Sequence, residues 1–197
     1  MRSYPKYGGL TAAKPRVRNP AAKITVRPRP GRPSQGLLHW AGTTFVCALG
    51  RGGISALKRE GDGATPLATM RLLHGFFRAG RAAAPRAPVM ASPLRFRRIG
   101  PDDGWCDAPG DRNYNRPVRL PYGASCEAMA RPDRLYDCVV VLDWNIRPRR
   151  RGRGSAIFLH IAREGFAPTE GCVAVSPRVM ARLVPYLSSR TVLTVLR

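Results

Sequence analysis

The chain has 197 residues, with 34 Lys and Arg against 12 Asp and Glu and a formal net charge of +22. That length predicts one domain of about 150 to 180 residues plus a disordered end, and it argues against a second full domain. The longest mostly apolar run, residues 37–49, contains His39, Thr43 and Thr44. Because this run is too short to span a bilayer, we expect no integral membrane segment.

A strongly basic chain ordinarily suggests nucleic acid, because Lys and Arg neutralise phosphates. Here only four of the basic residues are Lys, and the Arg residues come with much Ala, Gly and Pro, a mixture that GC-rich coding alone can produce. No stretch interleaves aromatic with basic residues or has the ligand spacing of a zinc finger. We therefore expect no nucleic-acid partner, and a basic nucleic-acid-binding protein remains the alternative from another functional class.

The N-terminal segment is basic and rich in proline. Residues 1–35 contain nine basic residues, six prolines and no acidic residue, so the start of the chain cannot bury enough apolar surface to offset the entropy of ordering. We predict a disordered basic tail over residues 1–22 and one folded domain over residues 23–197. No signal peptide is visible, since no apolar stretch of the required length precedes Leu37.

Five cysteines, at positions 47, 106, 126, 138 and 172, make an odd count without a C-x-x-C pair. This argues against a zinc site and against a fully paired disulfide framework. At least one thiol is left over. In an exported protein the other four could pair in three ways, but the simpler interpretation is that they are small buried hydrophobic residues.

The first half of the chain alternates predicted strands with polar loops. Clustered β-branched and aromatic residues bounded by Gly or Pro predict strands over residues 22–27 and 43–49, and a turn at 51–53. Residues 58–66 are rich in turn formers and predict an ordered surface loop. Residues 101–121 predict a long polar loop, and loops of that length in compact domains tend to be functional.

The second half begins with a continuous apolar run at 137–143, which predicts a strand buried on both faces. A further strand is expected over 155–161, where alternation puts Ala156, Phe158 and His160 on one face. Gly165 and Pro168 then return the chain to residues 172–176, so that the two strands would form a hairpin.

Ser176 followed by Pro177 is typical of a helix start, because the serine oxygen can cap free N–H groups and proline suits the first helical position. We expect this helix to end near residue 184 and a last strand to cover 191–196. The balance of several strands with one or two short helices predicts a β-rich α+β, mainly β, fold.

The hairpin would bring His160 and Cys172 within hydrogen-bond reach. A neighbouring imidazole lowers the pKa of a thiol and accepts its proton, as in cysteine nucleophiles. Gly171 has no Cβ where a substrate must approach, and the N–H groups of Gly171 and Cys172 could face a developing oxyanion. The alternative is that the imidazole packs beside a buried structural cysteine.

Four ordered segments resemble the L,D-transpeptidase (YkuD-type) catalytic domain family, in its short proteobacterial branch. They are GSAIFLH at 154–160 with PTEGCVA at 168–174, KREGDGATP at 58–66, GWCD at 104–107, and NYN at 113–115. The resemblance covers roughly residues 22–196. It implies that residues 23–197 form a β-sandwich-like L,D-transpeptidase catalytic domain.

The resemblance also implies the chemistry, a role in cell-wall biogenesis and cell shape, and a periplasmic location. Cys172 would attack a carbonyl of a peptidoglycan stem peptide, expel the terminal D-residue and form a thioester that an acceptor amine resolves. His160 would act as base and then acid, oriented by a backbone carbonyl. No metal and no cofactor would be needed, and carbapenems would acylate the thiol. If water were the acceptor, the enzyme would be an L,D-carboxypeptidase or endopeptidase.

This sequence departs from the common family pattern in the spacing from His160 to Cys172, in residues 67–70, and at two positions beside the Gly-Cys pair. Glu170 and Ala174 stand where His and Arg are usual around the Gly-Cys pair. Because stem peptides are rich in carboxylates, which Arg binds in a fork, substrate contacts are expected from other residues. The candidates are Arg112, Tyr114, Arg116, Thr169 and Glu170.

Each candidate has a structural alternative. Arg112, Tyr114 and Arg116 could instead only hold the long polar loop together. Glu170 is expected to pair with an Arg or with His160, or else to point to solvent. Lys58 and Asp62 are expected to stabilise a turn, because an Asp between two glycines commonly accepts backbone N–H bonds.

Overall fold

The structure is a computed structural model that describes residues 23–80 and 86–197. The tail predicted over residues 1–22 lies outside the described residues. The strands are β1 (Lys23–Arg29), β2 (Arg32–Trp40), β3 (Thr43–Ala48), β4 (Ile54–Ser55), β5 (Thr65–Pro66), β6 (Thr69–Phe77), β7 (Phe96–Arg98), β8 (Asp103–Cys106), β9 (Arg116–Arg119), β10 (Cys126–Ala128), β11 (Cys138–Leu142), β12 (Phe158–Ile161), β13 (Val173–Val175) and β14 (Val192–Val195). The helices are α1 (Arg86–Met90) and α2 (Pro177–Leu183), with short 3₁₀ turns η2 (Glu164–Phe166) and η3 (Val184–Tyr186).

The main sheet has nine strands in the order β11-β12-β13-β3-β2-β1-β14-β6-β7. Strand β11 also pairs with β6, so the hydrogen-bonded order closes on itself. Inside lies a core cluster that includes Ile24, Leu38, Leu159 and Leu193, all fully buried. The fold is mainly β, of the β-sandwich type, which confirms the predicted class.

Strand β11 is buried on both faces, as its apolar run predicts. Val140 faces one core cluster and Val139 and Val141 face the other. The strand can be apolar throughout because β12 covers one of its edges and β6 the other. This central position makes β11 the support on which β12, the strand of His160, is aligned.

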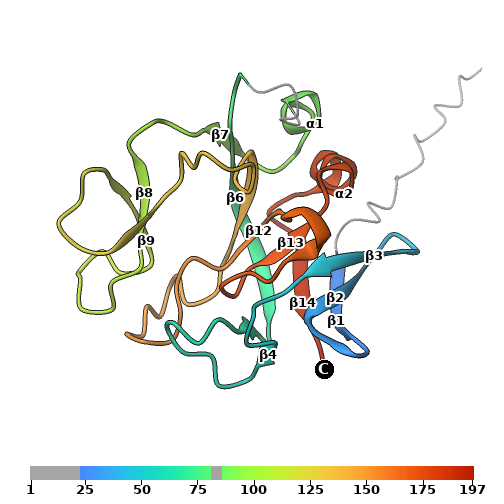
Figure 1. The fold of residues 1–197 in the computed structure, drawn as a ribbon. Helices are drawn as coiled ribbons and strands as arrows, with labels where there is room; N and C mark the ends of the chain where they lie inside the picture. Colours follow the sequence, from blue (N-terminus) through green and yellow to red (C-terminus); the bar gives the residue numbers. More distant parts are fainter. Residues whose placement is uncertain (1–22, 81–85) are drawn as a thin grey trace, which may run out of the picture.

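The prediction that residues 101–121 form one long polar loop is wrong. Strands β8 and β9 lie within it, and with β10 they form a separate three-stranded sheet on the opposite side of the molecule from β1, β2 and β3 (Figure 1). Tertiary contacts hold turn-forming residues such as Asp103 in these strands. Asp103 is buried because Arg97 and Arg119 both donate to its carboxylate, at 2.9 and 3.1 Å.

The loop predicted over residues 58–66 is ordered, but it ends in strand β5, which pairs with β4. The predicted turn at 51–53 is confirmed, with the Gly53 N–H donating to the Gly50 carbonyl at 2.8 Å.

The predicted hairpin between the strands of His160 and Cys172 is also wrong. Strands β12 and β13 are parallel, with Leu159 opposite Val173 and His160 opposite Ala174. The connection through η2 returns the chain along the whole length of β12 before β13 starts. Alternation of residues along a strand does not reveal strand direction, so the pattern could not distinguish a hairpin from this return.

Strand β12 starts at Phe158 rather than at Ser155, because Ala156 adopts a left-handed backbone with φ of 50°. The predicted alternation of faces is confirmed. Ile157, Leu159 and Ile161 join the inner cluster, whereas Phe158 joins the second cluster with Trp105 and Tyr136.

Helix α2 confirms the predicted helix start. The Ser176 hydroxyl accepts from the Val179 N–H at 3.3 Å, and Pro177 occupies the first turn. The helix buries Val179, Met180 and Leu183, and it lies with α1 at one end of the molecule (Figure 1). Among residues 23–80 and 86–197, no helix is long and apolar enough to cross a membrane.

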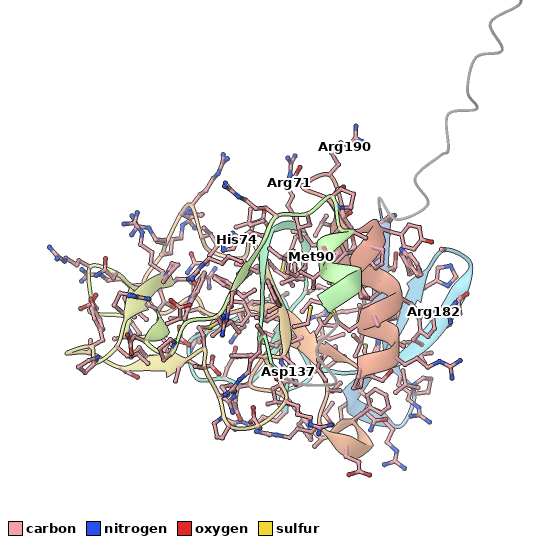
Figure 2. All side chains as sticks on the ribbon, turned by 90° about the horizontal axis from the view of Figure 1, so that it is seen from above. Arg71, His74, Met90, Asp137, Arg182 and Arg190 are labelled. Atoms are coloured by element: carbon pink, nitrogen blue, oxygen red, sulfur yellow. The ribbon has the colours of Figure 1, made fainter. Side chains whose placement is uncertain are left out.

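Many of the arginine side chains lie on the outside of the fold. Arg71, Arg182 and Arg190 project away from the ribbon into solvent (Figure 2). These three arginines come from a strand, a helix and a loop. Because their guanidinium groups are exposed to solvent, they stay hydrated and the core stays apolar.

Candidate active site

A cavity of about 180 Å³ lies between the main sheet and the three-stranded sheet. Its wall contains both Cys172 and His160. The other lining residues are Glu60, Asp107, Glu127, Arg131, Leu135, Tyr136, Ser155, Ala156, Arg163, Ala167, Pro168, Thr169 and Glu170. On a chain with few acidic residues, carboxylates are therefore concentrated around a thiol and an imidazole.

The Cys172 thiol is held by backbone groups of the segment that leads into β12. Its Sγ accepts from the Phe158 N–H at 3.3 Å and donates to the Ala156 carbonyl at 3.2 Å. The left-handed turn at Ala156 brings both groups to the sulfur. The residue sits directly before β13, whose first strand residue, Val173, is fully buried, so the sulfur is fixed at the end of a rigid element.

The His160 ring is oriented by the backbone, as the family resemblance implies. Its Nδ1 lies 2.8 Å from the carbonyl oxygen of Ile161. A carbonyl can only accept, so Nδ1 carries the proton and Nε2 of the neutral ring is left as the acceptor. The ring also packs edge-on against Tyr136, with the ring centres 5.4 Å apart. These contacts fix both the tautomer and the plane of the imidazole.

Burial sets the protonation states of both groups. Desolvation raises the pKa of the Cys172 thiol to about 12 and lowers the pKa of His160 to about 4. At neutral pH the pair therefore rests as a neutral thiol and a neutral imidazole, not as a thiolate and an imidazolium. The imidazole is available as a proton acceptor over the whole physiological range.

The segment before Cys172 is held by Thr169. Its hydroxyl donates to the Cys172 carbonyl at 2.7 Å and accepts from the Gly171 N–H at 3.2 Å. The expectation that the Gly171 N–H is free to bind an oxyanion is therefore wrong, because the threonine side chain already occupies this donor. Backbone bonds from Thr169 to Leu49 and Arg51 anchor the segment to the chain after β3.

Gly171 itself is required by the backbone. Its φ is +130°, and a Cβ at this position would lie 2.8 Å from the Ala64 carbonyl oxygen and 3.2 Å from Ile157 Cδ1. No L side chain fits both the dihedral and the space. The glycine allows residues 169–172 to pass close to the 58–66 loop.

That loop is closed by Lys58 and Asp62. The buried Lys58 ammonium donates to Asp62 Oδ1 at 2.5 Å, and the carboxylate also accepts from the N–H groups of Arg59 and Ala64. Partial burial opposes ionisation of Asp62, but these hydrogen bonds lower its pKa below the ordinary value. The prediction that both residues stabilise a turn is confirmed.

Asn115 is a buried residue that the sequence did not single out. Its side-chain oxygen accepts from the Trp105 indole at 3.0 Å and from the Ala156 N–H at 3.1 Å, and its amide donates to the Trp144 carbonyl at 3.1 Å. It thereby connects the three-stranded sheet to the residue whose carbonyl binds the thiol. The NYN segment was a visible signal, but only the fold shows what its last residue touches.

The expectation that Glu170 pairs with an arginine is confirmed. Its carboxylate pairs with Arg51 at 2.8 Å while most of the side chain stays exposed. Since the pair is solvated at the mouth of the cavity, it is screened and adds little to stability.

The three remaining residues predicted to bind substrate, Arg112, Tyr114 and Arg116, differ in their burial and in their position relative to the cavity. Arg112 and Arg116 are exposed and lie outside the cavity lining. Tyr114 is buried and donates to Glu60 Oε2 at 2.5 Å, which ties it to the cavity wall. Four of the predicted site residues therefore line one cavity, namely Cys172, His160, Thr169 and Glu170. Tyr114 does not line the cavity but contacts Glu60, which does.

Two arginines of the lining, Arg131 and Arg163, were missed by the sequence analysis. Arg131 binds Asp133 through two nitrogens at 2.8 and 3.0 Å, and Glu127 at 2.9 Å. The Tyr136 hydroxyl donates to the same Glu127 at 2.8 Å. Among many arginines nothing in the sequence marks these two, because their role depends on which loops meet at the cavity.

No three or more His, Cys, Asp or Glu side chains of residues 23–80 and 86–197 are grouped to hold an ion. The cavity lining offers a thiol, an imidazole, carboxylates and guanidinium groups.

Comparison with known proteins agrees with this site. The family model of the YkuD L,D-transpeptidase catalytic domain matches residues 33–195. Searches of the curated proteins and of the solved structures found no match. The matched range includes the whole cavity lining and extends from β2 to β14. The chain therefore belongs to the YkuD family of L,D-transpeptidase catalytic domains.

Proposed function

We propose that the protein is a peptidoglycan L,D-transpeptidase in which Cys172 is the nucleophile and His160 the general base. Family membership indicates an L,D-transpeptidase-type enzyme of peptidoglycan. The observation that carries the finer assignment is that one cavity holds the thiol and an imidazole whose Nδ1 is bound to the Ile161 carbonyl. A ring fixed in this tautomer presents an unprotonated Nε2 to a proton donor.

The resting pair is neutral, so attack and proton transfer belong to one step. The thiol hydrogen, which donates to the Ala156 carbonyl in the resting structure, first turns toward His160. As Sγ bonds to the carbonyl carbon of the diamino acid at stem position three, Nε2 of His160 accepts this proton. The carbonyl π electrons move to oxygen and form a tetrahedral oxyanion. With the Gly171 N–H bound to Thr169, the N–H of Cys172 is the backbone donor assigned to this oxyanion.

Collapse of the tetrahedral intermediate expels the terminal D-residue. The imidazolium of His160 gives its proton to the departing amine, and a thioester to Cys172 remains. An acceptor amine from another stem then attacks the thioester, His160 accepts its proton, and the thiol is restored. With water in place of the amine the same steps give an L,D-carboxypeptidase or endopeptidase.

Binding of the stem peptide is assigned to residues at the cavity and its rim. Arg131 and Arg163 line the cavity and can bind carboxylates, while the exposed Arg112 and Arg116 can bind them farther out. Glu170 can bind an ammonium group at the mouth. Tyr114 supports Glu60 in the wall, and Thr169, whose hydroxyl is bound within its own segment, positions Cys172.

The substrate is an extracytoplasmic polymer, and the family is typically extracytoplasmic. We assign the enzyme to the periplasm, where a role in cell-wall biogenesis and cell shape would be exerted.

The test is incubation with purified muropeptides, followed by mass analysis of the products. The expected product is a cross-linked dimer with loss of one D-residue, and a meropenem adduct should appear on the peptide that contains Cys172. Cys172→Ala and Cys172→Ser should lose both, whereas Cys47→Ala, altered at a core thiol away from the cavity, should retain both. Full turnover by Cys172→Ala would disprove the nucleophile.

A further inference from the structure

We propose that Cys106 and Cys126 form a disulfide that covalently closes the three-stranded sheet. Both are free thiols in the structure. Neither cysteine lines the cavity, so the bond is independent of the function proposed above. It follows from the register of two strands.

The two cysteines lie directly opposite one another. Strands β8 and β10 are antiparallel, with Cys126 opposite Cys106, Glu127 opposite Trp105 and Ala128 opposite Gly104. Directly opposed residues of an antiparallel pair project from the same face of the sheet, so both thiols are on one side.

The hydrogen bonds next to the pair show which kind of site it is. The Asp107 N–H donates to the Ser125 carbonyl at 3.2 Å, which are the residues immediately outside the two cysteines. Three residues from the cysteines, on the other side of the pair, the Met129 N–H donates to the Asp103 carbonyl at 2.8 Å. Cys106 and Cys126 are therefore a non-hydrogen-bonded pair, the closer of the two antiparallel pair types.

The spacing at such a site suits a disulfide. Non-hydrogen-bonded pairs have Cα atoms about 4.5 Å apart, and disulfides occur with Cα atoms about 4.4 to 6.8 Å apart. Closing the bond then requires rotation of two side chains about χ1 and no movement of either strand. Cys47 and Cys138 have no such cross-strand cysteine partner in the described sheets.

Exposure assigns the order of the exchange reaction. Cys126 is half-buried and Cys106 fully buried. The Cys126 thiolate attacks a small disulfide such as oxidised glutathione, releasing one glutathione thiolate and leaving a mixed disulfide. The Cys106 thiolate then attacks Sγ of Cys126 and releases the second glutathione. Two protein thiols are oxidised, one glutathione disulfide is reduced, and the two protons end on the two glutathione thiols.

The bond would lie behind the cavity wall. Alternation places the cysteines on the face opposite Trp105 and Glu127, while the residues that follow them, Asp107 and Glu127, both line the cavity. A disulfide would tie the three-residue strand β10, an edge strand, to β8. It would therefore hold the acidic wall of the cavity without entering the cavity.

To test this, the full chain is incubated with oxidised glutathione, quenched with acid and digested with trypsin without reductant. The disulfide predicts one linked species that joins residues 99–112 to residues 120–134 and separates on reduction. Recovery of both peptides with alkylatable thiols after oxidation, or of Cys126 joined to any other cysteine, would overturn the proposal.

Thermal unfolding gives a second readout on the same sample. The bond closes residues 106–126, so the oxidised chain should unfold about 5 to 10 °C above the reduced chain. Cys126→Ser should show neither the linked peptides nor the shift, whereas Cys47→Ala should show both. An oxidised chain with the linked peptides but no upward shift would overturn the claim that the bond holds β10 in place.

Discussion

At the residue scale, the site depends on how burial changes one imidazole. The carbonyl of Ile161 and the edge of Tyr136 hold His160 in place, and burial lowers its pKa to about 4. Unlike a surface histidine, it does not titrate between pH 6 and 8. Its capacity to accept the Cys172 proton is therefore constant over that range.

The first prediction compares acylation of Cys172 by a carbapenem in the parent and in His160→Ala. The parent rate should be nearly constant from pH 6 to 8, because the base is unprotonated throughout. The variant has only the thiolate fraction, whose pKa near 12 lies far above that range, so its rate should rise about tenfold per pH unit. At pH 7 it should be slower by about 10² to 10⁴.

Because His160→Ala leaves a cavity in the core, the melting temperature of each protein is measured alongside its rate. His160→Gln, which keeps most of the side-chain volume, serves as the second variant. The same pH slope in parent and variants would remove His160 from proton transfer.

At the element scale, the loops around the cavity are positioned by a few backbone contacts. Residues 169–172 cross the 58–66 loop at Gly171, where a Cβ would lie 2.8 Å from the Ala64 carbonyl oxygen. The position also has φ of +130°. Any side chain there must move both loops and with them the sulfur.

Gly171→Ala should therefore lower the free energy of unfolding by about 2 kcal/mol or more and slow thiol alkylation of Cys172. Chemical denaturation and alkylation kinetics measure the two effects. Gly110→Ala is the matched control, since a Cβ there meets nothing within 4 Å. Equal stabilities of the two variants would contradict this account of the loop crossing.

Asn115 is the second such contact, because it connects β8 to Ala156. Asn115→Ala leaves the N–H of the half-buried Ala156 and the buried Trp105 indole without a partner, which costs about 2 kcal/mol. It also frees the turn whose carbonyl binds Sγ of Cys172. We expect Cys172 alkylation to slow about tenfold and its pH profile to shift.

Asn113→Ala, in the same segment but bonded to Tyr122, should alkylate within about twofold of the parent. Unchanged kinetics and pH profile in Asn115→Ala would show that the residue supports only the fold.

At the scale of the whole molecule, the buried histidine makes the fold sensitive to acid. The folded-state pKa of His160 is about 4 against an ordinary value of 6.5. Between these values the unfolded chain binds a proton that the folded chain does not, so stability is complete above pH 6.5 and falls as pH approaches 4. His74, whose pKa is lowered by burial and by Arg97, acts in the same direction.

The expected loss from His160 over that interval is about 3 kcal/mol. Denaturant unfolding at pH 7, 5.5 and 4.5 measures it, and His160→Gln should show a correspondingly shallower decline. A variant that loses as much stability as the parent would show that other groups cause the acid sensitivity.

Several features of this protein could be predicted from local sequence. The apolar run of β11, the Ser176–Pro177 helix start and the face alternation around Phe158 are short-range patterns, and each is confirmed. The Asp62 turn belongs with them, because its hydrogen bonds close within a few residues. The family was visible because its motifs are short ordered runs, and the match over residues 33–195 confirms it.

Tertiary structure alone decided the direction of β13, the sheet formed by β8, β9 and β10, and the membership of the cavity wall. The physical reason is that strand direction and loop neighbours depend on pairings between residues far apart in the chain. Local periodicity is the same for parallel and antiparallel strands. Likewise, the backbone position of Ala156 and the identity of the lining arginines are set by which loops meet. The chain has many arginines, and only its packing brings Arg131 and Arg163 to the cavity that holds Cys172.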